Sequence, residues 1–311
     1  MILCIGTTPA VQRVMVFPRL VLDAVNRAVT TLNGAAGKSV NVAKVLNALG
    51  EASLATGFLG GDRGRQVEAV LIGHGVGMSF VQVAARTREC VTVIDQSSGR
   101  ITELVEESPS VTPAESEPLL AVIRQRLPGS RAVVMSGTIA PGVDQGLYRV
   151  CVQLAHEHRL LTVVDAQGVA LTEALAARPG LVKPNRSELA ATLRRELRDG
   201  VALVAGMREL GERGAQRVVV TAGKEPTLAF DGQKLWRIKS PRITAVNPIG
   251  SGDAFAAGVV WRLVRGDDLG EACRWGAAAG AANALTLMPG EVNRADVDRL
   301  AAEVAVEQIS D

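Results

Sequence analysis

Short runs of apolar residues recur through the first two-thirds of the chain, and a helical pattern follows most of them. The runs are rich in valine and mostly continuous, which is typical of parallel strands covered on both faces. They occupy residues 1–6, 53–60, 132–137, 161–166, 181–185 and 217–223. The helical patterns between them occupy residues 38–49, 63–73, 113–127, 144–158 and 199–213. This alternation predicts an α/β fold with a doubly wound, mainly parallel sheet flanked by helices.

Two stretches, residues 10–33 and 78–107, interrupt this rhythm because they carry few helix signals and favour β structure. Within the second stretch, the string TRECVTVIDQSSGRITELVEE predicts a hairpin with QSSG as its turn. The two stretches are compatible with a small β subdomain at the sheet edge, and equally with an ordinary extension of the sheet.

The chain becomes helical again towards its carboxy-terminal end. The patterns there occupy residues 252–265, 269–284 and 293–308. A length of 311 residues suggests about two domains, but single α/β domains often run this long. We therefore expect one domain over residues 1–311, with the two β stretches as a discontinuous attachment.

Composition and charge narrow the class of protein. Basic and acidic residues nearly balance, 34 against 32, which argues against nucleic-acid binding or membrane-surface binding through bulk charge. The four cysteines form no C-x-x-C pair, so zinc and dithiol redox chemistry have no support. We see no signal peptide and no stretch near the ~20 apolar residues that span a membrane. We expect a cytoplasmic protein with reduced cysteines.

The string NPIGSGDAFAAGVVWRL, residues 247–263, carries the strongest chemical signal. Gly250, Ser251 and Gly252 precede Asp253 and a helical run, and the first N–H groups of a helix have no partners inside it. Those groups and the helix dipole favour an anion such as a phosphoryl group. The Asp253 carboxylate could accept a proton from an attacking hydroxyl. The alternative is a plain helix N-cap, since Asp and Ser are favoured caps.

A second string, NGAAGKSVNVAKVLNALG, covers residues 33–50. Gly37, Lys38 and Asn41 follow a glycine turn and open an amphipathic helix, which suits a polyhydroxylated or phosphorylated ligand. We reject a phosphate-binding P-loop, because Leu32 stands where that loop requires its first glycine. A simple junction between a loop and a helix is the alternative.

The third string is LVKPNRSEL, residues 181–189. Asn185 and Glu188 lie three residues apart, on one side of a short helix. Near a phosphate they could hold Mg²⁺ through water, which suits a cation that keeps part of its hydration shell. The alternative is a capping box, with Asn185 as the N-cap and Glu188 as the third helical residue.

Together these strings resemble the PfkB (ribokinase-like) carbohydrate kinases over residues 1 to about 290. NPIGSGDAFAAG is similar to the carboxy-terminal signature of that family, AAGKSVNVAKVLNALG to its amino-terminal glycine motif and VKPNRSEL to its N-x-x-E magnesium motif. SGTIAPGV, residues 136–143, resembles its S-G-S-L-P-x-G segment. The form of the second string is similar to the branch of 1-phosphofructokinases and tagatose-6-phosphate kinases.

The resemblance implies a ribokinase-like fold and a role for each matching position. Asp253 would be the catalytic base, and the segment Gly250, Ser251 and Gly252 would form the anion hole. ATP would be the phosphoryl donor, and Glu188 would organise Mg²⁺ through water. On the nucleotide side, the implied residues are Lys183, Asn185, Thr221, Gly223 and Asn283.

The same resemblance implies a sugar site. Gly37, Lys38 and Asn41 would hold the sugar, and Arg88 would approach its phosphate. The β stretches 10–33 and 78–107 would form a lid, which in this family often pairs with a second lid to make a homodimer.

Two departures from the family pattern bear on specificity. Gln12 stands where the family has an aspartate that binds sugar hydroxyls, and Thr8 replaces the asparagine of the same motif. The nucleotide loop usually reads G-x-x-G, but here Pro226 replaces the second glycine, and proline lacks a backbone donor. The first departure puts the identity of the sugar substrate in question, and the second concerns the preference or affinity for the nucleotide.

The sequence therefore predicts an enzyme that transfers a phosphoryl group from Mg-ATP to a hydroxyl of a ketohexose phosphate. Fructose 1-phosphate, fructose 6-phosphate and tagatose 6-phosphate are the candidate substrates. A kinase of a nucleoside or unphosphorylated sugar is one alternative, against which Lys38 and Arg88 argue. A non-catalytic sensor of sugar phosphates or nucleotides on the same fold is another.

Overall fold

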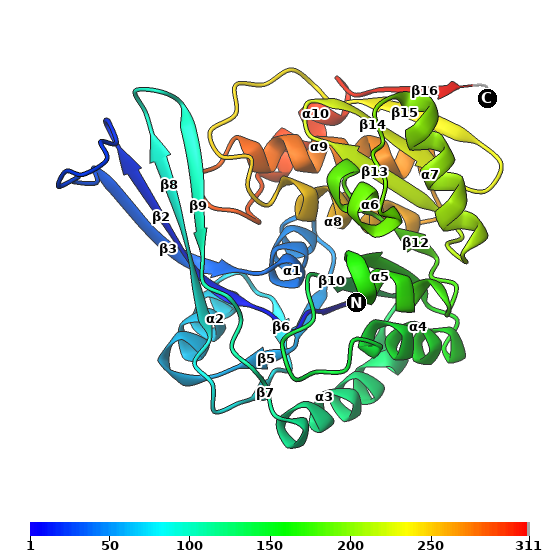
Figure 1. Ribbon diagram of the computed structural model, residues 1–311, viewed down its shortest axis with the longest axis horizontal. Coiled ribbons are helices and arrows are strands. Elements are labelled where there is room, and N and C mark those ends of the chain that lie inside the picture. The colour runs from blue at the N-terminus through cyan, green and yellow to red at the C-terminus, as the bar shows by residue number, and fades with distance from the viewer. Residues whose placement is uncertain (310–311) are drawn as a thin grey trace.

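The computed structural model describes residues 1–309, in which a ten-stranded sheet forms the central layer (Figure 1). Residues 310 and 311, the last two of the expected domain, lie outside this description. Seven neighbouring strands are parallel, in the order β6 (Gly77–Met78), β4 (Ser53–Thr56), β1 (Ile2–Ile5), β10 (Ala132–Ser136), β11 (Leu161–Asp165), β12 (Leu181–Val182) and β13 (Val218–Ala222). Three antiparallel strands follow: β14 (Glu225–Phe230), β15 (Leu235–Lys239) and β16 (Ala305–Ile309).

Helices cover both faces of the sheet, which confirms the doubly wound fold. One face packs against α1 (Lys38–Ala48), α2 (Gly61–Gly73), α8 (Ser251–Leu263), α9 (Leu269–Ala284) and α10 (Arg294–Ala301). The other packs against α3 (Pro113–Arg126), α4 (Leu147–Glu157), α5 (Gly168–Leu175), α6 (Arg186–Leu193) and α7 (Gly200–Glu212). Successive residues of a strand point to opposite faces of the sheet, so Ile2 packs in the hydrophobic core on one face and Leu3 in the core on the other. No helix in the described range is long and apolar enough to cross a membrane.

Helices α8 and α9 cross closely because small residues meet between them. A Cβ atom at Gly258 would lie 2.6 Å from the carbonyl oxygen of Trp275 and 2.9 Å from Cα of Gly276. The contact fixes α8, and with it the residues at its first turn.

A second sheet projects from the body at the left of Figure 1. Its order is β3 (Thr30–Ala36), β2 (Ala10–Phe17), β8 (Arg88–Asp95) and β9 (Arg100–Val105). The predicted QSSG turn joins β8 to β9, and its Gly99 has a φ of 66°. This sheet confirms the small separate sheet of the expected fold.

The expected β stretch 78–107 was too long at its start. Residues 81–82 form β7 (Val81–Gln82), which pairs with β5 (Phe58–Leu59) beside the central sheet, and only residues from Arg88 onward join the second sheet. The expected strand 53–60 is broken at Gly57, whose φ is 154°. Gly57 packs against the backbone at Gly6, where a Cβ atom on residue 57 would lie 1.9 Å from the Gly6 carbonyl oxygen. Backbone approach this close requires glycine.

The expected helix 293–308 was also too long. Helix α10 ends at Ala301, and Ala305–Ile309 instead forms β16, which pairs with β15 at the sheet edge. Strand pairing here overrides a helical sequence pattern, as tertiary context often does.

Candidate active site

The site lies where the strand order of the central sheet reverses. From β1 the chain runs to β4 on one side and later returns to β10 on the other side of β1. Ligands of open α/β sheets bind at such a point, outside the carboxyl ends of the strands. The loops after β1 and β10 meet there, since Thr7 Oγ1 donates to the Thr138 carbonyl oxygen at 3.0 Å.

Asp253 lies in the first turn of α8, behind a glycine turn. Gly250 is the N-cap and has a left-handed backbone, with a φ of 83°, so that the chain can turn directly into the helix. Asn41, from α1, donates its Nδ2 hydrogen to Asp253 Oδ2 at 2.7 Å. Burial raises the pKa of Asp253 to about 6, although Lys38, Asn41 and Lys183 act in the opposite direction. The carboxyl group is thus poised to exchange a proton near neutral pH.

The expected anion hole surrounds this carboxylate. The N–H of Ser251 donates to the Pro248 carbonyl oxygen at 3.1 Å, whereas within residues 1–309 the N–H groups of Gly250 and Gly252 have no acceptor. A Cβ atom on Gly252 would lie 3.8 Å from Lys183 Nζ. Two backbone donors, the helix dipole and one ammonium group therefore converge, which favours an anion.

Lys38 and Lys183 are held by one buried carboxylate, Asp165. Lys38 Nζ lies 3.1 Å from Asp165 Oδ1 and 3.1 Å from Glu188 Oε1, and Lys183 Nζ lies 3.0 Å from Asp165 Oδ2. Burial works against the charged form of Asp165, but the two lysines outweigh it and hold the pKa of Asp165 below its usual range. The pKa of Lys38 is raised by Asp165, Asp253 and Glu188 in spite of burial. Asp165 thus holds both ammonium groups in place.

The sequence analysis did not identify Asp165. The signal was present, since Asp165 lies in the predicted run 161–166 and is the last residue of β11, and functional side chains gather at the carboxyl ends of parallel strands. A carboxylate that directly follows two buried valines at a strand end is exposed to such a site or paired within it.

Asn185 and Glu188 form the capping box that was the alternative explanation of their spacing. Asn185 Oδ1 accepts from the Glu188 N–H at 2.8 Å, and Glu188 Oε2 accepts from the Asn185 N–H at 2.8 Å. The remaining oxygen, Oε1, faces Lys38. No group of three or more metal-ligating side chains occurs in the described part of the chain. A single carboxylate suits Mg²⁺ that keeps most of its waters and is shared with substrate phosphates.

Thr221 and Gly223 lie beside this capping box. Thr221 is bridged to Asn185, and its N–H donates to the Pro184 carbonyl oxygen at 3.3 Å. Gly223 opens the turn between β13 and β14 with a φ of 61°. Pro226, the departure from the family pattern, is the second residue of β14 and not part of this turn.

Asn283 has a structural position in α9. It is fully buried; its Nδ2 donates to the Ile249 carbonyl oxygen at 2.9 Å and its Oδ1 accepts from the Gly290 N–H at 2.8 Å. Its amide is therefore committed to the loop before α8. The contact of Asn283 with a nucleotide stays a prediction, and in this structure the residue links α9 to the loops at Ile249 and Gly290.

The residues expected on the sugar side come from α1 and the second sheet. Gly37 has a φ of 106° and approaches the chain at Pro9, where a Cβ atom would lie 2.8 Å from Pro9 Cα. Arg88 donates through Nη2 to the Thr8 carbonyl oxygen at 3.0 Å. Gln12 is 1% exposed and donates through Nε2 to Thr92 Oγ1 at 2.9 Å. Lys38 is paired with Asp165 and Glu188, and its contact with the sugar stays a prediction.

The comparison with known proteins decides the family. A sequence model described as pfkB family carbohydrate kinase matches residues 1–292. The chain belongs to the pfkB family of carbohydrate kinases. A tagatose-6-phosphate kinase from Staphylococcus epidermidis is 30% identical over 312 residues, which cover 99% of this chain and 100% of that one.

Solved structures agree with this assignment. A protein described as a possible 1-phosphofructokinase from Thermotoga maritima has a TM-score of 0.91 and 26% identity, with 99% of each chain covered. Phosphofructokinase-2 from Escherichia coli, in complex with fructose-6-phosphate, has a TM-score of 0.86 and 25% identity over 97% of this chain and 98% of that one. The expectation of a carbohydrate kinase is confirmed, and membership of a kinase family implies ATP as co-substrate.

Proposed function

We propose that this pfkB kinase transfers the γ-phosphoryl group of ATP to a hydroxyl of a ketohexose phosphate. The candidates are fructose 1-phosphate, fructose 6-phosphate and tagatose 6-phosphate, the substrate class in the names of its relatives. The observation that carries the proposal is the position of the Asp253 carboxylate beside the N–H groups of Gly250 and Gly252 and near Lys183.

In this proposal Asp253 accepts the proton of the sugar hydroxyl as the oxygen attacks the γ-phosphorus atom. A new oxygen–phosphorus bond forms, the bond to the β-phosphate oxygen breaks, and ADP leaves. Charge on the transferred group meets the α8 N-terminus and the Lys183 ammonium group. Such preorganised donors stabilise phosphoryl transfer more than any covalent chemistry of the protein does.

The donor set also fits Mg²⁺. Glu188 and Asn185 would hold the ion through water, beside the nucleotide phosphates and close to Thr221 and Gly223. Bound there, the ion would neutralise phosphate charge. Asp165 has a separate part in the proposal, because it pairs with both Lys38 and Lys183 and holds them in place.

Arg88 is the candidate for binding the phosphate that the substrate already carries. Arginine can hold a phosphate with two parallel hydrogen bonds, and Arg88 is only half-buried and anchored on Thr8. Lys38 would support it less directly, because its ammonium group is engaged by two carboxylates. Arg88→Ala should raise KM for the sugar phosphate far more than KM for ATP. Arg100→Ala, on the exposed strand β9 of the same sheet, is the matched control. Equal effects of Arg88→Ala on both substrates would contradict this assignment.

The second sheet is proposed to act as a lid and as a dimer contact. Gln12, Val14 and Thr92 are buried on one of its faces. Large apolar side chains are exposed on its strands and its β2–β3 loop: Val21, Leu22, Val25, Leu104 and Val105. Exposed apolar patches mark contact surfaces, and a second copy of the chain is the proposed partner. Light scattering should give a dimer for the wild type and for Ile72→Asp, an exposed site on α2, and a monomer for Leu22→Asp.

The proposed function is tested by ATP turnover against the three ketohexose phosphates, their unphosphorylated sugars and a nucleoside panel. A kcat/KM preference for one ketohexose phosphate supports the proposal. Preference for an unphosphorylated sugar or a nucleoside would favour the second candidate class. Binding of sugar phosphate without turnover would favour a sensor.

A further inference from the structure

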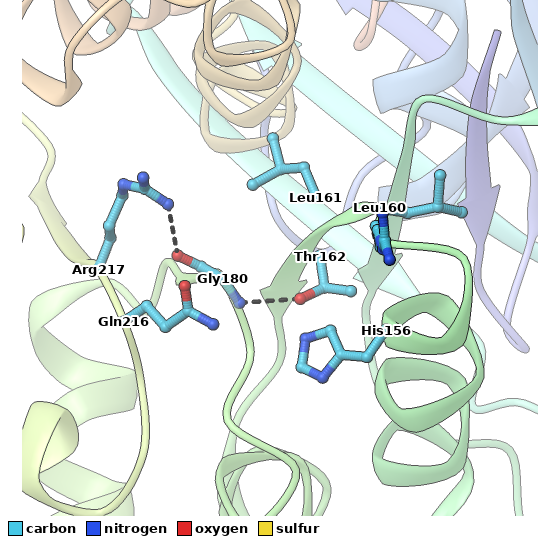
Figure 2. Close-up of a pocket in the computed structure, with 8 residues that line it drawn as sticks. His156, Leu160, Leu161, Thr162, Gly180, Gln216 and Arg217 are labelled. Atoms are coloured by element: carbon cyan, nitrogen blue, oxygen red, sulfur yellow. Dashed lines mark hydrogen bonds between the residues drawn. The ribbon is translucent and has the colours of Figure 1, made fainter.

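A hollow of about 300 Å³ lies at the amino-terminal ends of β11, β12 and β13, and Figure 2 shows its lining residues. Its lining includes His156, Arg159, Thr162, Gly180, Gln216 and Arg217. These residues stand before or at the starts of β11, β12 and β13, whereas the active site lies beyond the other ends of β11 and β12. Five strand residues of β11 separate the two places, or roughly 15 Å along the strand.

The strand order places one arginine on each side of this hollow. Arg159 comes two residues before β11 and Arg217 comes directly before β13, on either side of β12. Neighbouring strands are about 4.8 Å apart, so the two backbones are separated by roughly 10 Å. Long arginine side chains from both sides can reach one small ligand across that gap.

The donors in the hollow are only partly satisfied. Arg217 donates one hydrogen bond, from Nη1 to the Gly180 carbonyl oxygen at 3.3 Å, and the Gly180 N–H donates to Thr162 Oγ1 at 2.8 Å, as Figure 2 shows. Within residues 1–309 no carboxylate lies within 4.0 Å of the guanidinium group of Arg159 or Arg217. By contrast, Arg131, which directly precedes β10, is paired with Glu51 at 3.3 Å.

Arg159 also occupies a backbone conformation that favours glycine. It follows the C-terminus of α4 with a φ of 54°, where glycine is the usual residue and a side chain costs roughly 1 kcal/mol. Arginine near a helix C-terminus interacts favourably with the helix dipole, and this is the purely structural explanation. The dipole accounts for a cation there, but not for the second arginine and the amide of Gln216 around the same hollow.

We propose that this hollow, defined by Arg159, Gln216, Arg217 and His156, binds a small phosphate-bearing anion at a second site. Guanidinium groups hold phosphate oxygens in pairs of parallel hydrogen bonds. His156 supplies a further donor, as does the second amide hydrogen of Gln216, whose Nε2 also donates to the Arg178 carbonyl oxygen at 3.2 Å. The site is separate from the kinase chemistry and does not depend on the proposed substrate.

The test is a titration of the full-length protein with inorganic pyrophosphate, followed by amide NMR. We expect saturable shifts of the Gly180 and Gln216 amides, distinct from any shifts at Gly250 and Gly252 in the active site. Arg159→Gln and Arg217→Gln should each weaken binding at this hollow by about tenfold or more, the usual effect of losing a charged hydrogen bond. Arg149→Gln, on α4 but paired with Glu173, should leave it unchanged.

Two outcomes would overturn the proposal. The first is that pyrophosphate shifts only the active-site amides, and the second is that the two variants bind it at the hollow as the wild type does. Both arginines are at the surface, so the variants should fold and keep the wild-type kcat with ATP. A variant that keeps the wild-type kcat is folded, so its weaker binding of pyrophosphate can be assigned to the second site.

Discussion

The Nδ2 group of Asn41 lies 2.7 Å from Oδ2 of Asp253 and donates a hydrogen bond to that carboxylate. The two residues belong to the second and the first of the sequence motifs, 212 positions apart. The bond joins α1 to α8 in the interior and favours the charged form of Asp253, against the effect of burial. The strength of the proposed base therefore depends on a residue of the glycine motif.

The first prediction concerns pH. Because the pKa of Asp253 is about 6, kcat should fall as the pH drops through 6, where the carboxylate takes up a proton and can no longer act as a base. Asn41→Ala removes a hydrogen bond to the charged form, so the midpoint should move upward by about one unit. Asn47→Ala, on the same helix but bonded to the His74 carbonyl oxygen, should leave the midpoint in place. An unshifted profile for Asn41→Ala would remove Asn41 from this role.

The second prediction concerns the base itself. Asp253→Asn keeps the size of the side chain but removes its basicity, so kcat should fall by at least ~10²-fold, the scale of general-base catalysis. ATP binding, measured by calorimetry, should persist, because the N-terminus of α8 and Lys183 remain. Turnover near that of the wild type would show that another group accepts the proton.

The third prediction concerns Gln12. Its Nε2 donates to Thr92 Oγ1, so Gln12 would contact a sugar hydroxyl through Oε1, or through Nε2 after exchanging that partner. An aspartate carboxylate accepts hydrogen bonds but cannot donate them, and its side chain is one methylene shorter than that of glutamine. Gln12→Asp therefore removes the hydrogen bond that the Gln12 amide donates to Thr92 Oγ1. We expect changed KM values and a changed ranking of fructose 1-phosphate, fructose 6-phosphate and tagatose 6-phosphate. If neither changes, Gln12 only ties β2 to β8.

The fourth prediction concerns packing between α8 and α9. Gly258→Ala places a methyl group 2.6 Å from the Trp275 carbonyl oxygen, and backbone atoms cannot move aside cheaply. We expect a loss of about 1–3 kcal/mol in the free energy of unfolding, measured by denaturant titration. Gly73→Ala, where nothing lies within 4 Å of the new atom, should be neutral or slightly stabilising. Similar values for the two variants would mean that the helices separate to admit the methyl group.

The fifth prediction concerns Lys44, a buried lysine on α1. It donates to the carbonyl oxygens of Ala35 at 3.1 Å and Pro289 at 2.9 Å, and burial lowers its pKa to about 8. Between pH 8 and its ordinary value of 10.5 the unfolded chain binds more protons, so this group makes stability rise with pH.

The Lys44→Met variant has no ammonium group at this position, so this contribution to the pH dependence of stability is absent. The difference in unfolding free energy, wild type minus variant, should therefore grow by up to about 3 kcal/mol from pH 8 to pH 10.5. Glu291, which favours the charged form of Lys44, is itself paired with His74. A difference that stays constant with pH would show that Lys44 has an ordinary pKa in the folded protein.

The sequence predicted the parallel strands well, because runs such as AVVMS and RVVVTA are apolar on both faces and only a covered sheet accommodates them. It did not predict β14, β15 and β16. Of these three only β16 is an edge strand, and it depends on its pairing with β15. That pairing is a long-range contact, which a local pattern does not contain.

The sequence predicted those residues of the candidate site that lie in short local motifs. Asp253, Gly250 and Asn41 lie in recognisable strings, and the structure brings them together. Asp165 was missed because one carboxylate at the end of a strand is not a motif, and its importance comes from Lys38 and Lys183, which arrive from two other segments. The hydrogen bond between Asn283 and Gly290 was hidden for the same reason, since it depends on how the loop at Gly290 packs against α9.

The packing of α1 against α8 has a consequence for synthesis of the chain. Val42, Val45 and Leu46 of α1 belong to a core that is completed by α8 and α9. Until those helices leave the ribosome, one side of the nascent sheet exposes apolar surface that no earlier segment covers. Such surface is where chaperones bind and where premature aggregation begins.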